Sequence, residues 1–134
     1  MSLPRGFRNC NPGNLIISNI PWKGKIPVSQ NTDGKFEQFE TMEKGQRAMD
    51  IVIRTYIRKK GLDTIEKIIP VYAPSIENNV ETYIQTVEII SGFCRDAVID
   101  FDYDTMKKII PAMVYHENGR PLPKGVFERA WELI

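Results

Sequence analysis

One carboxylate lies at a position where the surrounding pattern predicts an apolar side chain. A helix is predicted from Asp102 or Asp104 to Asn118, just before Gly119, and Glu117 lies near its end. At about 100° per residue, Glu117 shares a stripe with the apolar positions Met106, Ile109, Ile110 and Met113. A carboxyl group that points inward from such a stripe is partly desolvated, which raises its pKa and suits a general acid at neutral pH. Alternatively, the helix frays and Glu117 reaches into water.

His116 lies on the flank of the same stripe and is the only histidine of the chain. A single histidine is commonly a partly buried residue without a chemical role, and a base or ligand is the other interpretation. The two cysteines, Cys10 and Cys94, have no neighbours at metal or redox spacing and are interpreted as reduced thiols. A zinc or other transition-metal site is therefore not expected.

The stretch from 72 to 83 carries tyrosines, amides and a carboxylate at the start of a predicted helix. One interpretation is N-terminal capping by Ser75 or Asn78, with Glu77 favourable beside the helix dipole. The other is sugar binding, in which amides and hydroxyls bind ring substituents while tyrosines stack on the apolar face of the ring. The residues for that role are Tyr72, Glu77, Asn78, Asn79 and Tyr83.

The N-terminal segment has Asn9, Asn11 and Asn14 around a Pro-Gly turn, followed by Trp22. These asparagines are compatible with a loop held by Asx turns, and equally compatible with a polar groove. Trp22 fits either a core position or a platform for a sugar ring. Asn11, Asn14 and Trp22 are therefore candidates for substrate binding.

The elements that must position these residues divide the chain into two parts. Residues 1–40 are rich in Asn, Gly and Pro with short apolar bursts, which predicts loops and a small β-hairpin that turns at Asp33-Gly34. Residues 41–134 have helical periodicity. Helices are predicted over 42–60, 63–70, 76–91, 102–118 and 126–133, with Pro70 ending or distorting the second.

Composition indicates a single globular domain over 1–134. Of the 134 residues, 42% are hydrophobic and 26% charged, which allows a core and excludes disorder. The formal net charge of +1 gives no long-range field for polyanions, so nucleic-acid binding is not expected. No apolar run approaches the roughly 20 residues that cross a bilayer, and the first residues lack the apolar stretch of a signal peptide. We therefore expect synthesis in the cytoplasm and no membrane insertion.

Several short motifs, taken in chain order, resemble a family of small proteins that are encoded by bacterial prophages and mobile elements and usually labelled virion structural proteins. The motifs are Arg5-Gly-x-Arg-Asn-x-Asn-Pro-Gly-Asn14, Trp22-x-Gly24, Asp33-x-x-Phe-x-x-Phe39, Gly45-x-Arg-Ala48, Ala73-Pro-x-x-Glu-Asn-Asn79 with Tyr83-Ile84, and Glu117-Asn-Gly119. They span nearly the whole chain. The chain departs from the family pattern at Cys10, where Asn is common.

This family looks lysozyme-like, which implies an α+β, mainly α fold: a helical bundle with a small N-terminal loop and β-hairpin region. Residues 112–119 are similar to the helix-ending Glu-Ser-Gly motif that carries the catalytic acid of lytic transglycosylases and related glucosaminidases. In those enzymes an Asn-rich loop and a β-hairpin follow the motif. The similar pieces stand at the N-terminus here, which resembles a circular permutation. The segment from Glu77 to Ile84 resembles a late transglycosylase helix that bears a tyrosine in the cleft.

The resemblance implies a peptidoglycan-cleaving muramidase, most simply a lytic transglycosylase that acts on the bond between N-acetylmuramic acid and N-acetylglucosamine. Glu117 would be its general acid and base, and no cofactor is called for. The substrate-binding residues expected are Asn11, Asn14, Trp22, Tyr72, Glu77, Asn78, Asn79, Tyr83, His116 and Asn118. If a second carboxylate takes part, Asp33 or Glu40 is the candidate and the enzyme would be a lysozyme-type hydrolase.

The alternative from another class is a non-catalytic protein, either a virion structural component or a cell-wall-binding protein. For both classes the implied partner is the glycan strand of peptidoglycan, bound by a monomer. Action is expected in the cell wall or periplasm, or as part of a phage particle.

Overall fold

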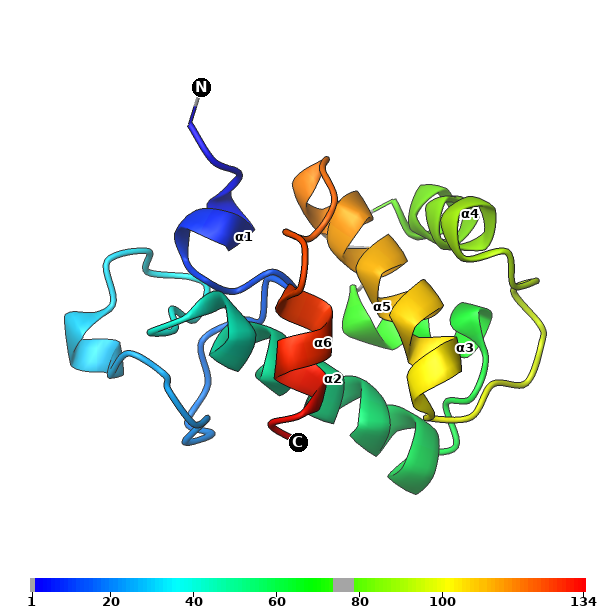
Figure 1. Ribbon diagram of the computed structural model, residues 1–134, viewed down its shortest axis with the longest axis horizontal. Helices are drawn as coiled ribbons and strands as arrows, with labels where there is room; N and C mark the ends of the chain where they lie inside the picture. The colour runs from blue at the N-terminus through cyan, green and yellow to red at the C-terminus, as the bar shows by residue number, and fades with distance from the viewer. Residues whose placement is uncertain (1, 74–78) are drawn as a thin grey trace.

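Helix α5 runs through the middle of the molecule, with the other helices around it (Figure 1). The computed structural model describes residues 2–73 and 79–134. Its elements are α1 (Arg5–Arg8), the 3-10 helix η1 (Val28–Gln30), α2 (Met42–Lys59), α3 (Ile65–Tyr72), α4 (Val80–Ser91), α5 (Tyr103–Asn118) and α6 (Val126–Trp131). Helix α4 packs along α5 and against α3, α6 packs along α2, and α1 packs against α5. The fold is therefore mainly helical, as the periodicity predicts.

The main helices begin and end at capping residues that the sequence provides. The N-terminal caps, whose side chains accept a hydrogen bond from the backbone N–H three residues later, are Thr41, Thr64, Asn79 and Asp102. Each of these bonds satisfies a donor that the first helical turn leaves unpaired. Gly92 and Gly119 end α4 and α5 in the left-handed conformation, with φ of 81° and 73°. The predicted ends of α4 at Gly92 and of α5 at Gly119 are thereby confirmed, and so is Asp102 as the cap of α5, whereas α4 begins at Val80 with Asn79 as its cap rather than Ser75 or Asn78.

Two helix ends differ from the prediction. Helix α3 does not end at Pro70 but continues to Tyr72. Pro70 is exposed, so the helix carbonyl that loses its N–H partner there can be hydrated. Helix α6 ends at Trp131 rather than at Leu133. Leu133 is itself exposed, so no burial of its side chain extends the helix.

The core is built from one face of each long helix. The large apolar and aromatic residues with the most complete burial are Met49, Ile53, Ile65, Ile68, Ile69, Tyr83, Met106, Ile109, Ile110 and Met113. An aromatic cluster lies beside α6 and consists of Phe101, Tyr103, Phe127 and Trp131. The apolar stripe of α5 that precedes Glu117 is thus inside the protein, and this fixes the direction in which that helix ends.

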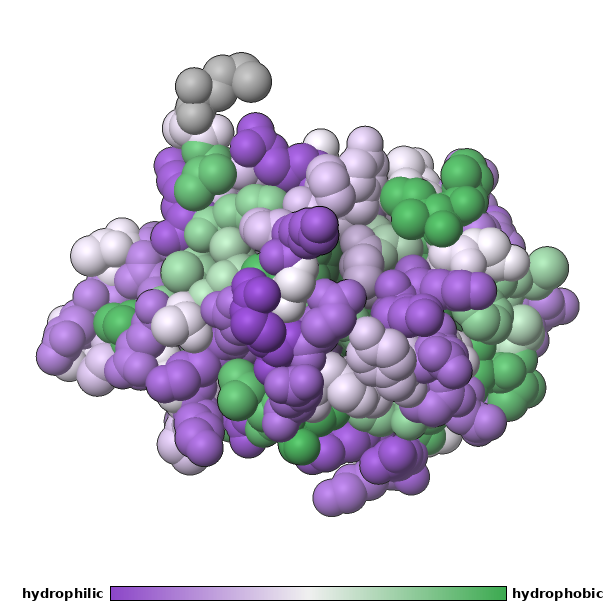
Figure 2. Space-filling view, in the orientation of Figure 1, coloured by the Kyte–Doolittle hydropathy of each residue, from purple (hydrophilic) through white to green (hydrophobic). Residues whose placement is uncertain are grey.

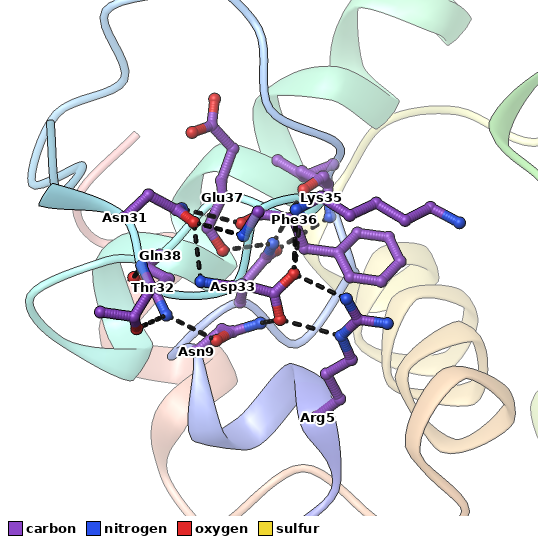
Figure 3. Close-up of polar contacts among 12 residues, drawn as sticks. Arg5, Asn9, Asn31, Thr32, Asp33, Lys35, Phe36, Glu37 and Gln38 are labelled. Carbon is purple, nitrogen blue, oxygen red and sulfur yellow. Dashed lines mark hydrogen bonds and ion pairs between the residues drawn. The ribbon is translucent and has the colours of Figure 1, made fainter. Parts of the chain in front are cut away.

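The predicted β-hairpin at Asp33-Gly34 is wrong for the described residues. In its place are two isolated antiparallel bridges, Ile16 with Phe36 and Lys25 with Phe39. The side chains of Asn31 and Asp33 accept hydrogen bonds from the backbone N–H groups of residues 33–36 (Figure 3). These bonds close a polar loop, because a side chain that binds its own backbone competes with strand pairing.

The surface in view in Figure 2 is mostly hydrophilic, with apolar side chains in small, separate groups. The most exposed large apolar side chains are Ile89 and Val98. Within the described part of the chain, none of the helices is both long enough and apolar enough to cross a bilayer.

Candidate active site

A groove of about 450 Å³ lies between the N-terminal segment and the helices. Residues from 13–22 and 35–36 form one wall, and Val52 and Tyr56 of α2 with Tyr72 and Ala73 at the end of α3 form the other. The lining residues are Gly13, Asn14, Leu15, Ile16, Ser18, Ile20, Trp22, Lys35, Phe36, Val52, Tyr56, Tyr72, Ala73 and Glu117. The groove therefore joins the two parts of the chain and places one carboxylate among mostly apolar and aromatic side chains.

Glu117 is mostly buried, and a hydrogen bond joins it to the N-terminal segment. Asn14 donates from Nδ2 to Oε1 of Glu117 at 3.0 Å. Burial raises the pKa of Glu117, while the bond from Asn14 and the nearby hydroxyl of Tyr83 act in the opposite direction. The hydroxyl of Tyr83 makes no hydrogen bond of ordinary geometry among the described residues. It nevertheless lies close enough to Glu117 to favour the ionised carboxylate. Glu117 therefore keeps its proton to a higher pH than an exposed glutamate.

Asn11 is fully buried and does not line the groove. Its amide donates to the carbonyls of Leu15 and Glu37, both at 3.0 Å, and its Oδ1 accepts a hydrogen bond from the N–H of Leu15. The polar atoms of this side chain are thus used inside the protein. The expected contact of Asn11 with substrate is corrected accordingly: Asn11 shapes the loop that carries Asn14.

Asn118 also turns to this loop and not to the groove. Its Nδ2 donates to the carbonyl of Pro12 at 2.8 Å. Gly6 in α1 lies so close that a Cβ atom there would collide with the side-chain oxygens of Asn118 and Asn14. Asn14 has a φ of 51°, in the left-handed region that asparagine tolerates better than most residues. Helices α1 and α5 therefore hold the loop so that Asn14 faces Glu117.

Tyr83 and His116 form a stacked pair with ring centroids 4.0 Å apart. Nδ1 of His116 lies 3.3 Å from the hydroxyl of Thr86. Burial lowers the pKa of His116, which favours the neutral ring. Neither ring lines the groove, so the two residues act on the site through the Tyr83 hydroxyl near Glu117.

The other predicted sugar-binding residues are divided between different places. Trp22 and Tyr72 line the groove. Asn79 caps α4, accepting a hydrogen bond from the N–H of Thr82 at 3.0 Å, and lies away from the groove lining. Glu77 and Asn78 lie outside the described residues.

Neither predicted second carboxylate lines the groove. Asp33 accepts two hydrogen bonds from Arg5 at 2.8 Å and one from Asn9 at 3.0 Å (Figure 3). The Arg5 guanidinium, helped by Asn9, holds the pKa of Asp33 well below its usual range. Glu40 is exposed and pairs with Lys44 at 3.1 Å. Both carboxylates are therefore committed to contacts elsewhere, which sequence spacing does not reveal.

Sequence reasoning misses two buried carboxylates. Oε2 of Glu37 lies 2.9 Å from Nζ of Lys25, and the carboxylate points away from the Asp33 cluster in Figure 3. Asp50 accepts a hydrogen bond from Gln46 at 2.9 Å, and burial raises the pKa of Asp50 to about 7. The signal for Asp50 is its place beside the apolar stripe of α2. In the described ranges, no three His, Cys, Asp or Glu side chains are grouped so as to hold a metal ion.

A curated phage protein is similar to the chain over most of its length. No family model matches the chain. "Protein P5" of Pseudoalteromonas phage PM2 is 37% identical over 118 residues, which cover 86% of this chain and 71% of that protein. The chain belongs to the same family as Protein P5. Membership of the P5 family agrees with the phage-related origin that the sequence motifs imply.

Proposed function

We propose that this member of the P5 family is a peptidoglycan-cleaving muramidase of the lytic transglycosylase type, with Glu117 as general acid and base. The observation that carries the proposal is the mostly buried carboxyl group of Glu117 on the lining of the groove, with Asn14 bound to one oxygen. A carboxyl group whose pKa is raised by burial keeps its proton to a higher pH, and this favours its use as a proton donor.

The walls of the groove suit a glycan chain. Trp22, Phe36 and Tyr56 contribute aromatic rings to the lining, and the apolar faces of sugar rings stack on such rings. The volume of about 450 Å³ lies within the usual range of small-ligand sites.

Bond cleavage would begin with proton transfer from Glu117. The proton goes to the oxygen that links N-acetylmuramic acid to the next N-acetylglucosamine, and the bond from that oxygen to the anomeric carbon breaks. Glu117 becomes a carboxylate beside the positive charge that develops at the anomeric carbon. Asn14 donates a hydrogen bond to this carboxylate, which stabilises the ionised form at the moment when it is produced.

The second step would use the same carboxylate as a base. Glu117 takes the proton of the 6-hydroxyl of the same muramic residue, and the oxygen attacks the anomeric carbon. A 1,6-anhydro ring closes and Glu117 is protonated again. Among the described residues that line the groove, Glu117 is the only carboxylate, which favours this one-acid route over the two-carboxylate route of a lysozyme-type hydrolase.

Zymography on purified peptidoglycan tests the proposal. The wild type is expected to clear the substrate, and Glu117→Gln is expected to abolish clearing while the fold is kept. Glu128→Gln is the matched control, because it makes the same chemical change at an exposed position away from the groove. Binding to peptidoglycan without lysis by folded wild-type protein refutes the enzyme and supports the non-catalytic alternative.

Mass analysis of the released fragments separates the two catalytic routes. A transglycosylase leaves anhydro ends, which are lighter by one water than the reducing ends from a hydrolase. Asp33→Asn and Glu40→Gln are expected to retain activity. If either variant loses activity and the wild-type product carries reducing ends, the enzyme is instead the two-carboxylate hydrolase.

The place of action follows from the substrate and the relative. We propose that the protein acts on the cell wall, either free in the periplasm or as a component of a phage particle. The similarity to Protein P5 supports a phage context.

A further inference from the structure

Tyr72 is the last residue of α3, and its hydroxyl reaches the N-terminal loop. Oη of Tyr72 donates a hydrogen bond to the carbonyl oxygen of Gly13 at 2.6 Å. The ring meets Tyr56 edge-on, with centroids 6.5 Å apart and an angle of 79° between the planes. Burial, together with the carboxylate of Glu117, raises the pKa of Tyr72 well above its ordinary value. The hydroxyl therefore stays protonated and remains a donor to the loop.

Gly13 lies against Met49 of α2 and Tyr72 of α3. A Cβ atom at this residue would collide with Oη of Tyr72 and would lie 2.8 Å from Sδ of Met49. The absence of a side chain lets the loop backbone approach α2 and α3 this closely. The carbonyl that Tyr72 binds belongs to the peptide group between Gly13 and Asn14. Its orientation therefore sets where the Asn14 side chain begins.

We propose that Tyr72 is a positioning residue for Glu117: its hydroxyl fixes the peptide group before Asn14, and Asn14 in turn binds the Glu117 carboxylate. This inference rests on the proposed function for its effect on catalysis, but the linkage from Tyr72 to Glu117 exists without it. It is additional to the expected role of Tyr72 as a stacking platform for sugar, because the residue also lines the groove.

The peptide group between Gly13 and Asn14 is held at both ends: its N–H donates to the carbonyl of Asn11 at 3.0 Å, and its carbonyl oxygen accepts the hydrogen bond from Tyr72. Asn11 fixes the following backbone through Leu15, and Asn118 binds the carbonyl of Pro12. Neither contact involves the carbonyl of Gly13. Asn14 has φ of 51°, in the left-handed region, which asparagine tolerates but which the surrounding contacts must maintain. Loss of the Tyr72 hydroxyl removes one of the two hydrogen bonds that hold this peptide group, and is therefore expected to loosen Asn14.

The substitution Tyr72→Phe removes the hydroxyl and keeps the ring. The pKa of Glu117, followed by NMR titration of its side-chain carbon, is expected to rise, because Asn14 no longer stabilises the carboxylate fully. Lysis is expected to show a fall of about fivefold in kcat with little change in KM, the effect of one lost neutral hydrogen bond of about 1 kcal/mol. The alkaline limb of the pH profile is expected to move to higher pH.

Tyr56→Phe is the matched control, because it makes the same change in the neighbouring ring of the groove wall, whose hydroxyl makes no hydrogen bond to residues 11–14. It is expected to leave the pKa of Glu117 unchanged. Asn14→Gly supplies the second variant, since glycine accepts the positive φ. In the Asn14→Gly background, Tyr72→Phe is expected to have no further effect on Glu117.

The NMR titration keeps this inference separate from the proposed function. If the wild type does not cleave peptidoglycan, the proposed function fails, and the titration still decides the role of Tyr72. An unchanged pKa of Glu117 in folded Tyr72→Phe overturns the inference. So does an equal effect of Tyr72→Phe with and without the Asn14 side chain.

Discussion

Replacing Asp50 with Asn is expected to remove a pH-dependent cost of folding. Asp50 is fully buried and accepts one hydrogen bond from Gln46, and its Oδ2 has no partner among the described residues. Burial, offset only in part by Gln46, raises the pKa of Asp50 from 3.8 to about 7. Between these two pKa values, the folded protein holds a proton on Asp50 that the unfolded chain releases.

The sign follows from the direction of this pKa change. Below the lower pKa both states are protonated, and Asp50 adds no cost. As the pH rises towards the higher pKa, the unfolded state is favoured by ionisation and the free energy of unfolding falls. The full difference is about 4 kcal/mol, at about 1.4 kcal/mol for each pH unit between the two pKa values. From about pH 5 to about pH 8 the wild type is therefore expected to lose about 2 to 3 kcal/mol that Asp50→Asn does not lose.

Urea unfolding at a series of pH values measures this difference, with the free energy of unfolding extrapolated to water at each pH. Other titrating groups are present in both proteins, so their contributions cancel in the comparison. The exposed Asp100 provides the control, because Asp100→Asn is expected to follow the wild type. A constant difference between wild type and Asp50→Asn over the whole range would falsify the reasoning.

Two further substitutions test a buried ion pair and a left-handed helix end. Lys25→Met is expected to lower the free energy of unfolding by about 3 to 5 kcal/mol, because it leaves the buried carboxylate of Glu37 without its ion-pair partner; the double variant with Glu37→Leu is expected to regain most of this in urea unfolding, and no recovery would contradict the ion-pair explanation. Gly119→Ala is expected to cost about 1 kcal/mol, because φ is 73° and no atom lies near enough to compensate. Gly119→Asn is expected to cost less, and equal thermal stability of all three proteins would argue against backbone strain.

The helices follow from the sequence because their signals are local. Asp102 and Gly119 mark both ends of α5 within the residues that form it, and Gly92 marks the end of α4, although the cap of α4 is Asn79 and not the predicted Ser75 or Asn78. The N-terminal segment is different, since Ile16 pairs with Phe36 across a polar loop that spacing does not encode. Asp33-Gly34 suggests a hairpin. The side chain of Asp33 instead accepts hydrogen bonds from Arg5 and from the backbone N–H of Phe36, and these bonds favour a polar loop.

The site shows the same division between local and distant information. Periodicity predicts that Glu117 points inward, because three turns of one helix share that stripe. The separate roles of Asn11 and Asn14 are not predictable, since both are loop asparagines three residues apart. Which of them is buried depends on where Glu37 and Glu117 arrive from other parts of the chain. Residue type limits what each side chain can do, and tertiary packing selects the partner.

The hydrogen bond between Asn14 and Glu117 joins residues 103 positions apart, and this has a consequence for biosynthesis. A nascent chain on the ribosome exposes its asparagine loop long before α5 has been translated, so the acid and its partner cannot meet early. Fragments that stop before Glu117 lack the acid, and fragments that begin after Asn14 lack its hydrogen-bond donor. The pairing of Asn14 with Glu117, and with it the proposed catalytic arrangement, would thus form late in synthesis.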